Sequence, residues 1–267
     1  MKFALRTLAA SLVLFLLGAA HHHSWGEAAS AVLVCTILCW MTVRSQAPGA
    51  ELVVTLAGFY FILVSLTTIP EGVLFDVIKV GQAPLMMVRE LGIALAIAIA
   101  IALLFQRSKA ALGATAAPIA EMTIIGLLWR VVAAVVVFTL CYFVAGMLIF
   151  PLVKSYYQGR NMPDLVAMVA MVVLKVMCLI VATWLALRRI PSRGDARLIL
   201  ATAFPVIGVF SLMLHHNDIM PPAVRWVHTM EMTPYYALCG FLFAVWFGPP
   251  RESQSPADRA KKSELGT

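Results

Sequence analysis

The sequence predicts an all-α protein, a bundle of helices that crosses a membrane several times. Of its 267 residues, 62% are hydrophobic and only 12% are charged, and the mean hydropathy is +0.92. So few polar residues cannot cover a soluble globule of this size. The apolar runs are about 20 residues long, which is the length of a helix that crosses the hydrocarbon core. Strands of a membrane barrel would instead show about 10 residues of alternating polarity.

The first apolar run lies at the start of the chain. Lys2 and Arg6 precede an apolar core over residues 8–17, and three small residues follow up to Ala20. A retained helix and a secretory signal that is cleaved after Ala20 share this layout. We therefore expect about eight membrane spans, or seven if residues 1–20 are removed.

Further apolar runs follow, and together with the first they make residues 1–250 a single transmembrane domain. We place these spans at residues 28–43, 50–69, 88–105, 124–150, 164–187, 196–214 and 224–247. Segment 70–87 is too polar to span and too apolar for a free loop, so we expect a short interfacial or partly re-entrant element there. Residues 251–267 are polar with mixed charges, which predicts a disordered cytoplasmic tail.

The distribution of Lys and Arg predicts the orientation in the membrane. With eight spans, one side collects fourteen of the twenty basic residues and the other side only five. Cytoplasmic loops are enriched in basic residues, so we expect both termini in the cytoplasm and a multi-pass protein of the cytoplasmic (inner) membrane. The same placement explains the net charge of +7, and we expect no nucleic-acid partner.

Small residues recur every four positions in the span 88–105, at Gly92, Ala96 and Ala100. Such spacing lets two helix backbones approach closely. This face therefore packs inside the bundle or forms the seam of a homo-oligomer. The five cysteines all fall within apolar runs without metal-binding spacing, which is typical of small packing residues.

All six histidines fall on or near the extracytoplasmic face in this topology. His215 and His216 end one span, and His228 begins the next. Imidazoles beside outward-facing carboxylates can relay protons or bind a metal cation, so these three histidines are candidate ligands for a divalent metal. Methionines in the same stretch would instead favour copper as the bound ion: Met213, Met220, Met230 and Met232.

Two further groups lie within the predicted spans at depths where charge is costly. His228, Glu231 and Tyr235 share one face of the last helix, either as a proton or cation site or simply because His228 and Glu231 bond to each other and fix the helix end. Lys175 lies near the middle of its span, too deep for its side chain to reach the interface. It must therefore face the bundle interior, be neutral, or pair with a carboxylate or hydroxyl group, and Tyr142 lies at a compatible depth as a hydrogen-bond partner.

These residues lead to one principal functional expectation. We expect a protein that binds or transports a small solute or ion through an outward-facing polar cavity. Lys175 would supply charge near the middle of the membrane, and His228 and Glu231 would form an outer proton or cation site. Glu71 is a further candidate, and whether it shares one cavity with Lys175 and Glu231 is left open. The alternatives are a membrane-embedded enzyme with a His/Glu site, with or without a metal, and a structural or assembly subunit. The sequence contains no GxSxG, HExxH or P-loop signature that would favour the enzyme.

Overall fold

The computed structural model describes residues 2–18, 24–105, 123–158, 162–214 and 220–248. These ranges contain helices and turns and no strand, which confirms the all-α class. Within them, six helical stretches are long and apolar enough to cross a membrane, as expected of a multi-pass membrane protein that contacts lipid: Trp25–Arg44, Gly49–Leu74, Ala83–Leu104, Ile124–Tyr157, Leu165–Leu187 and Arg193–Leu214.

Every predicted span corresponds to a helix or to a run of helices. In chain order these are α1 (Lys2–Gly18), α2 (Trp25–Arg44), α3 (Gly49–Phe61), η1 (Ile62–Leu66), α4 (Ile69–Leu74), α5 (Ala83–Leu104), α6 (Ile124–Tyr157), α7 (Leu165–Leu187), α8 (Arg193–Pro205), η3 (Val206–Phe210), α9 (Ser211–Leu214) and α10 (Pro222–Phe247). Helices α1 and α10 are not among the six apolar stretches, so the count of eight spans stays a prediction. Helix α1 has 17 residues, and α10 carries polar residues in its first half.

Local sequence explains where several helices begin. Ser24 and Glu27 form a capping box at the start of α2, each side chain bonding the other's backbone N–H. Asp164 caps α7 by accepting a hydrogen bond from the backbone N–H of Ala167. Pro222 occupies the first position of α10, where a missing N–H costs nothing.

Two helices contain a π-helical turn, and these turns contact each other in the core. η1 lies between α3 and α4, and η3 follows Pro205 at the end of α8. Gly208 of η3 makes this contact close, because a Cβ there would lie 3.2 Å from the ring of Tyr236 and 3.7 Å from the carbonyl oxygen of Leu63 in η1. The π turn η1 and the turn at residues 67 and 68 separate α3 from α4, the helix that carries Glu71.

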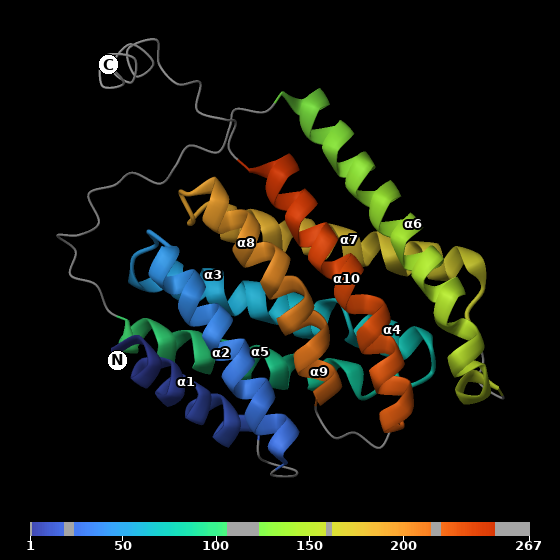
Figure 1. Ribbon diagram of the computed structural model, residues 1–267, viewed down its shortest axis with the longest axis horizontal. Helices are drawn as coiled ribbons and strands as arrows, with labels where there is room; N and C mark the ends of the chain where they lie inside the picture. Colours follow the sequence, from blue (N-terminus) through green and yellow to red (C-terminus); the bar gives the residue numbers. More distant parts are fainter. Residues whose placement is uncertain (1, 19–23, 106–122, 159–161, 215–219, 249–267) are drawn as a thin grey trace, which may run out of the picture.

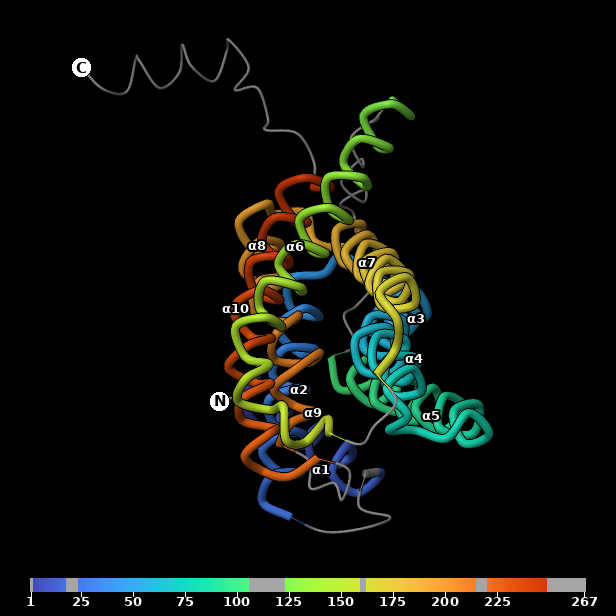
Figure 2. The backbone as a smooth tube through the Cα atoms, turned by 90° about the vertical axis from the view of Figure 1, so that its right-hand side faces the viewer, coloured from blue at the N-terminus to red at the C-terminus, as the bar shows by residue number. Residues whose placement is uncertain are grey.

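The helices form two layers (Figure 2). Helices α2, α6, α8 and α10 make one layer, and α3, α5 and α7 make the other, while α1 contacts both α2 and α5. Helices α8 and α10 lie side by side, and α6 follows α10 before its N-terminal end extends beyond the bundle (Figure 1). The apolar side chains at that end of α6 are exposed, among them Ile125 and Trp129, as expected of a surface that faces lipid.

In the expected interfacial segment 70–87, residues 70–74 belong to the short helix α4, a turn with Asp76 at φ 54° follows, and α5 begins at Ala83, so its interfacial position stays a prediction. One sequence-based expectation differs from this fold. The small residues Gly92, Ala96 and Ala100 are exposed or half-buried and do not form the packing face of α5 within the bundle. The buried face is offset from them and consists of Ala94, Ile97, Ala98 and Ile101.

Candidate functional site

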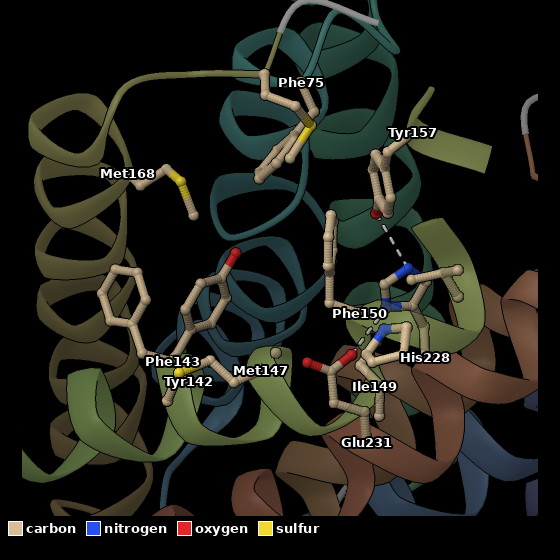
Figure 3. A pocket seen from close by; sticks show the side chains of 14 residues that line it. Phe75, Tyr142, Phe143, Met147, Ile149, Phe150, Tyr157, Met168, His228 and Glu231 are labelled. Carbon is tan, nitrogen blue, oxygen red and sulfur yellow. Dashed lines mark hydrogen bonds and ion pairs between the residues drawn. The ribbon is translucent and has the colours of Figure 1, made fainter. Parts of the chain in front are cut away.

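A cavity of about 380 Å³ lies between α6, α7, α10 and the turn that follows α4 (Figure 3). Met168 and Phe143 lie on one side of it, and Phe150, Tyr157 and His228 lie on the other. The lining is mostly aromatic and aliphatic, so the cavity is less polar than the sequence led us to expect. Its polar side chains are Tyr142, Tyr157, His228 and Glu231.

The middle and end of α6 shape one wall of the cavity. Gly146 and Pro151 both line it, and Pro151 lies inside the helix, where it removes one backbone hydrogen bond. A Cβ on Gly146 would meet only the Oε1 atom of Glu231, at 3.8 Å. The missing side chain at this position therefore leaves space in front of the Glu231 carboxylate.

Lys175 is held by a carboxylate behind this wall. Its Nζ atom lies 2.6 Å from Oε2 of Glu71, and Tyr142 donates a hydrogen bond of 3.1 Å from its hydroxyl to Oε1 of Glu71. The Lys175 side chain is only 1% exposed and the Glu71 side chain 20%. The ammonium also lies 5.8 Å from the centre of the Tyr142 ring. Two direct partners thus compensate the Glu71 charge.

Tyr236 completes the surroundings of Lys175 from α10. Its hydroxyl lies near the ammonium, and its ring is fully buried against Phe138 of α6, with ring centres 5.8 Å apart. Within the described part of the chain the Tyr236 hydroxyl has no partner in hydrogen-bond geometry. Lys175 and Glu71 do not line the cavity, and Tyr142 is the member of this network that does.

A second network links Tyr157, His228 and Glu231. Nδ1 of His228 lies 2.9 Å from Oε2 of Glu231, and Nε2 lies 3.1 Å from the Tyr157 hydroxyl. A neutral imidazole satisfies both contacts when Nδ1 donates to the carboxylate and Nε2 accepts from the hydroxyl. The two side chains from α10 are mostly buried, with 14% of His228 and 8% of Glu231 exposed.

Tyr142 connects the two networks, because it donates a hydrogen bond to Glu71 and lines the cavity together with Glu231. Tyr235 is buried, packs edge-on against Phe138 with ring centres 5.5 Å apart, and has no hydrogen-bond partner among the described residues. It therefore supports the wall and makes no direct bond to the neighbouring carboxylates.

The predicted metal site stays a prediction, because two of its three ligands, His215 and His216, lie outside the described residues. Within the described residues, no group of three His, Cys, Asp or Glu side chains has metal-binding geometry. Both ring nitrogens of His228 are already engaged, so binding a metal there would require breaking one contact. The methionines of the cavity are Met147, Met162 and Met168, none of which was a predicted copper ligand.

Several residues of the site had no signal in the sequence. Tyr157 was not singled out, although its hydroxyl completes the His228 network from a position 71 residues earlier in the chain. Gly146 and Phe75 were also missed, because an isolated glycine or phenylalanine in an apolar run is ordinary. Comparison of the chain with protein-family models, curated proteins and solved structures found no significant match. The site's own geometry therefore carries the functional conclusion.

Proposed function

We propose that this protein is a multi-pass membrane protein that binds a small solute in the cavity between α6, α7 and α10, as the binding step of transport across the membrane. One observation carries the proposal: the cavity has the size of a small-molecule site, an apolar lining and a few polar groups that converge on it. Glu231, His228 and the two tyrosine hydroxyls are these polar groups, and we expect the cavity to open to the extracytoplasmic side.

The two networks have different parts in this proposal. The Lys175–Glu71 pair is compensated and hidden, so it fixes the position of Tyr142 and does not contact solute. Glu231 and His228 line the cavity and exchange the proton or cation that accompanies the solute. We therefore propose that Glu231, and not Lys175, contacts the solute.

Filling the cavity tests the proposal. Gly146→Leu places a side chain into the cavity in front of Glu231, and in a helix Leu is favoured over Gly by about 0.5–1 kcal/mol. Gly92→Leu is the matched control, because a Cβ at Gly92 meets nothing within 4 Å. Three benzyl compounds of one shape serve as probes: benzyltrimethylammonium, its neutral carbon analogue (2,2-dimethylpropyl)benzene, and phenylmethanesulfonate.

Binding is measured by titration calorimetry on the protein in lipid nanodiscs. The same bilayer surrounds every variant, so partitioning of the probe into lipid cancels in the difference between them. We expect at least one probe to bind the wild type and the Gly92→Leu variant, and to lose at least about tenfold in affinity with Gly146→Leu, because the probe and the new side chain compete for one space. If no probe is sensitive to Gly146→Leu, the cavity is not a solute site.

The Tyr157–His228–Glu231 network also favours a second candidate, a membrane-embedded enzyme. A hydroxyl bonded to an imidazole that a carboxylate orients is the arrangement of an activated nucleophile or general acid. Such an enzyme predicts that Tyr157→Phe abolishes turnover while leaving ligand affinity within about threefold. A solute-binding protein predicts that the same variant changes affinity or transport only and forms no product from a bound ligand.

A further inference from the structure

We infer that the cavity selects a lipophilic organic monocation, an alkylammonium or arylammonium group carried on an apolar body. The inference rests on the proposed function, because it assigns a ligand class to the same cavity. Three features carry it: the charged groups of the lining, the position of one carboxylate oxygen, and the number of aromatic rings in the lining.

The described lining contains one carboxylate and no Lys or Arg. Among the described residues that line the cavity, Glu231 is the only one with a full charge when His228 is neutral. Lys175, the only buried Lys or Arg among the described residues, lies outside the lining and is bound to Glu71 at 2.6 Å. An anionic ligand would therefore meet repulsion without a basic partner, whereas a cation would compensate a carboxylate that is only 8% exposed.

One oxygen of that carboxylate is directed toward the open space. Oε2 of Glu231 is engaged by His228 at 2.9 Å, whereas Oε1 is the atom nearest to the position that a Cβ on Gly146 would occupy, at 3.8 Å. Gly146 lines the cavity, so the space next to Oε1 is cavity space. A ligand ammonium there would contact the carboxylate without displacing the imidazole.

Aromatic rings line much of the cavity. Five of the lining side chains are aromatic and come from α6 and the turn after α4: Phe75, Tyr142, Phe143, Phe150 and Tyr157. The face of an aromatic ring attracts a cation, by as much as about 2 kcal/mol when both are removed from water. Such rings also accept apolar substituents, so they suit an ammonium that bears alkyl or aryl groups.

The same lining argues against an inorganic cation. Hard metal ions take six or more oxygen ligands, and Na⁺ likewise prefers several oxygens to rings. The described lining offers one free carboxylate oxygen and the hydroxyls of Tyr142 and Tyr157, both of which are already bonded. Apolar contact with the methionine and phenylalanine side chains would contribute nothing to a bare ion, whereas it stabilises a bulky organic cation.

The three benzyl probes test the charge class directly on the wild-type protein. They share one shape, and the heat of each probe with protein-free nanodiscs is subtracted to remove its partitioning into lipid, so their order of affinity reports the charge. We expect benzyltrimethylammonium to bind about tenfold more tightly, or more, than its neutral carbon analogue, and phenylmethanesulfonate to bind most weakly. This order needs no variant, so it can be read even if a substitution at Glu231 impairs folding.

Two carboxylate variants locate the source of the preference. Glu231→Gln keeps an acceptor for His228 and removes the charge, so the preference for the cation should fall to within about twofold. Glu90→Gln is the matched control, because Glu90 is a half-buried carboxylate in span α5 that does not line the cavity. It should leave the preference unchanged, and Glu231→Asp should restore most of it.

Each remaining outcome overturns a different statement. If the neutral or sulfonate probe binds as tightly as the cation and Gly146→Leu still removes binding, the cavity is a solute site and the inferred charge class is wrong. If the preference for the cation survives Glu231→Gln, its assignment to that carboxylate is wrong. If Gly146→Leu affects no probe, the proposed function fails and this inference fails with it.

Discussion

The contact between Lys175 and Glu71 allows a quantitative test of how this bundle holds charge in its interior. Lys175 is 1% exposed and Glu71 20%, with 2.6 Å between Nζ and Oε2. Removing one partner of a buried ion pair leaves the other uncompensated, which costs about 3–5 kcal/mol, whereas replacing both is often nearly neutral. A double-mutant cycle with Lys175→Met and Glu71→Gln separates these effects.

The two single variants should lose different amounts of stability, because the group left behind has different remaining contacts in each. Glu71→Gln leaves a fully buried ammonium, so we expect a loss near the upper end, about 3–5 kcal/mol. Lys175→Met leaves a carboxylate that keeps the Tyr142 hydrogen bond and some solvent contact, so we expect about 1–3 kcal/mol. The double variant should lie within about 1.5 kcal/mol of wild type, since both replacements are similar in volume.

The assay is equilibrium unfolding in mixed micelles, followed by circular dichroism, on all four members of the cycle. We expect a coupling energy of about 3 kcal/mol or more. The exposed pair Arg44–Asp195, at 3.3 Å with 52% and 22% of the side chains exposed, is a matched control whose coupling should stay below about 1 kcal/mol. Additive single effects at Lys175 and Glu71 would refute the pairing on which this reasoning depends.

The same double variant separates a structural pair from a contact site. Neither Lys175 nor Glu71 lines the cavity, and the amide oxygen that Glu71→Gln introduces can still accept the Tyr142 hydrogen bond. We therefore expect the double variant to bind the benzyl probes within about threefold of wild type. A folded double variant that binds no probe would show that the pair contributes to the ligand site itself.

Three further predictions concern packing, hydrogen bonding and orientation. Gly240→Ala should lower the thermal midpoint sharply, because a Cβ there collides with the carbonyl of Leu200 where α10 crosses α8. The control Gly92→Ala should leave the midpoint unchanged or raise it, and equal effects of the two variants would contradict this crossing. Tyr157→Phe leaves Nε2 of His228 without its hydroxyl, so the free energy of unfolding should fall by about 1–3 kcal/mol in a chemical-denaturation assay, and no change would contradict the contact. At the C-terminus, a fused reporter that functions in the cytoplasm should be active, and one that functions only after export should be inactive. Activity of the export-dependent reporter would contradict the topology.

The helical class and the place of most helices follow from hydropathy alone, whereas the partners of the buried charges do not. The depth of Lys175 in its span made a carboxylate or hydroxyl partner one of three alternatives, and the structure supplies Glu71 from 104 residues earlier in the chain. No local pattern specifies a contact over that separation. The π turn before α4 adds to the difficulty, because it changes the face on which Glu71 emerges relative to a regular helix.

The contact within one helix was easier to anticipate. His228 and Glu231 are three residues apart, which places them on one helix face, and their atoms lie 2.9 Å apart in the structure. The character of the cavity was not accessible in the same way. An apolar side chain on a membrane helix can face lipid, a neighbouring helix or a cavity with the same hydropathy, so Phe143, Met147 and Phe150 carried no distinguishing signal.

The two networks differ in whether both oxygens of their carboxylate have a bonding partner. In the Lys175–Glu71 network, the ammonium compensates one carboxylate oxygen and the Tyr142 hydroxyl bonds the other, which is sufficient to fix α4 against α7. In the His228 network, Oε2 of Glu231 is bonded whereas Oε1 adjoins cavity space beside Gly146. A mostly buried carboxylate oxygen without a partner is costly, and a purely structural contact gains nothing from directing such an oxygen into a cavity. The substitution Glu231→Gln therefore distinguishes a structural role from a binding role. A structural role predicts unchanged or higher stability and unchanged probe binding. A binding role predicts loss of the preference for cations.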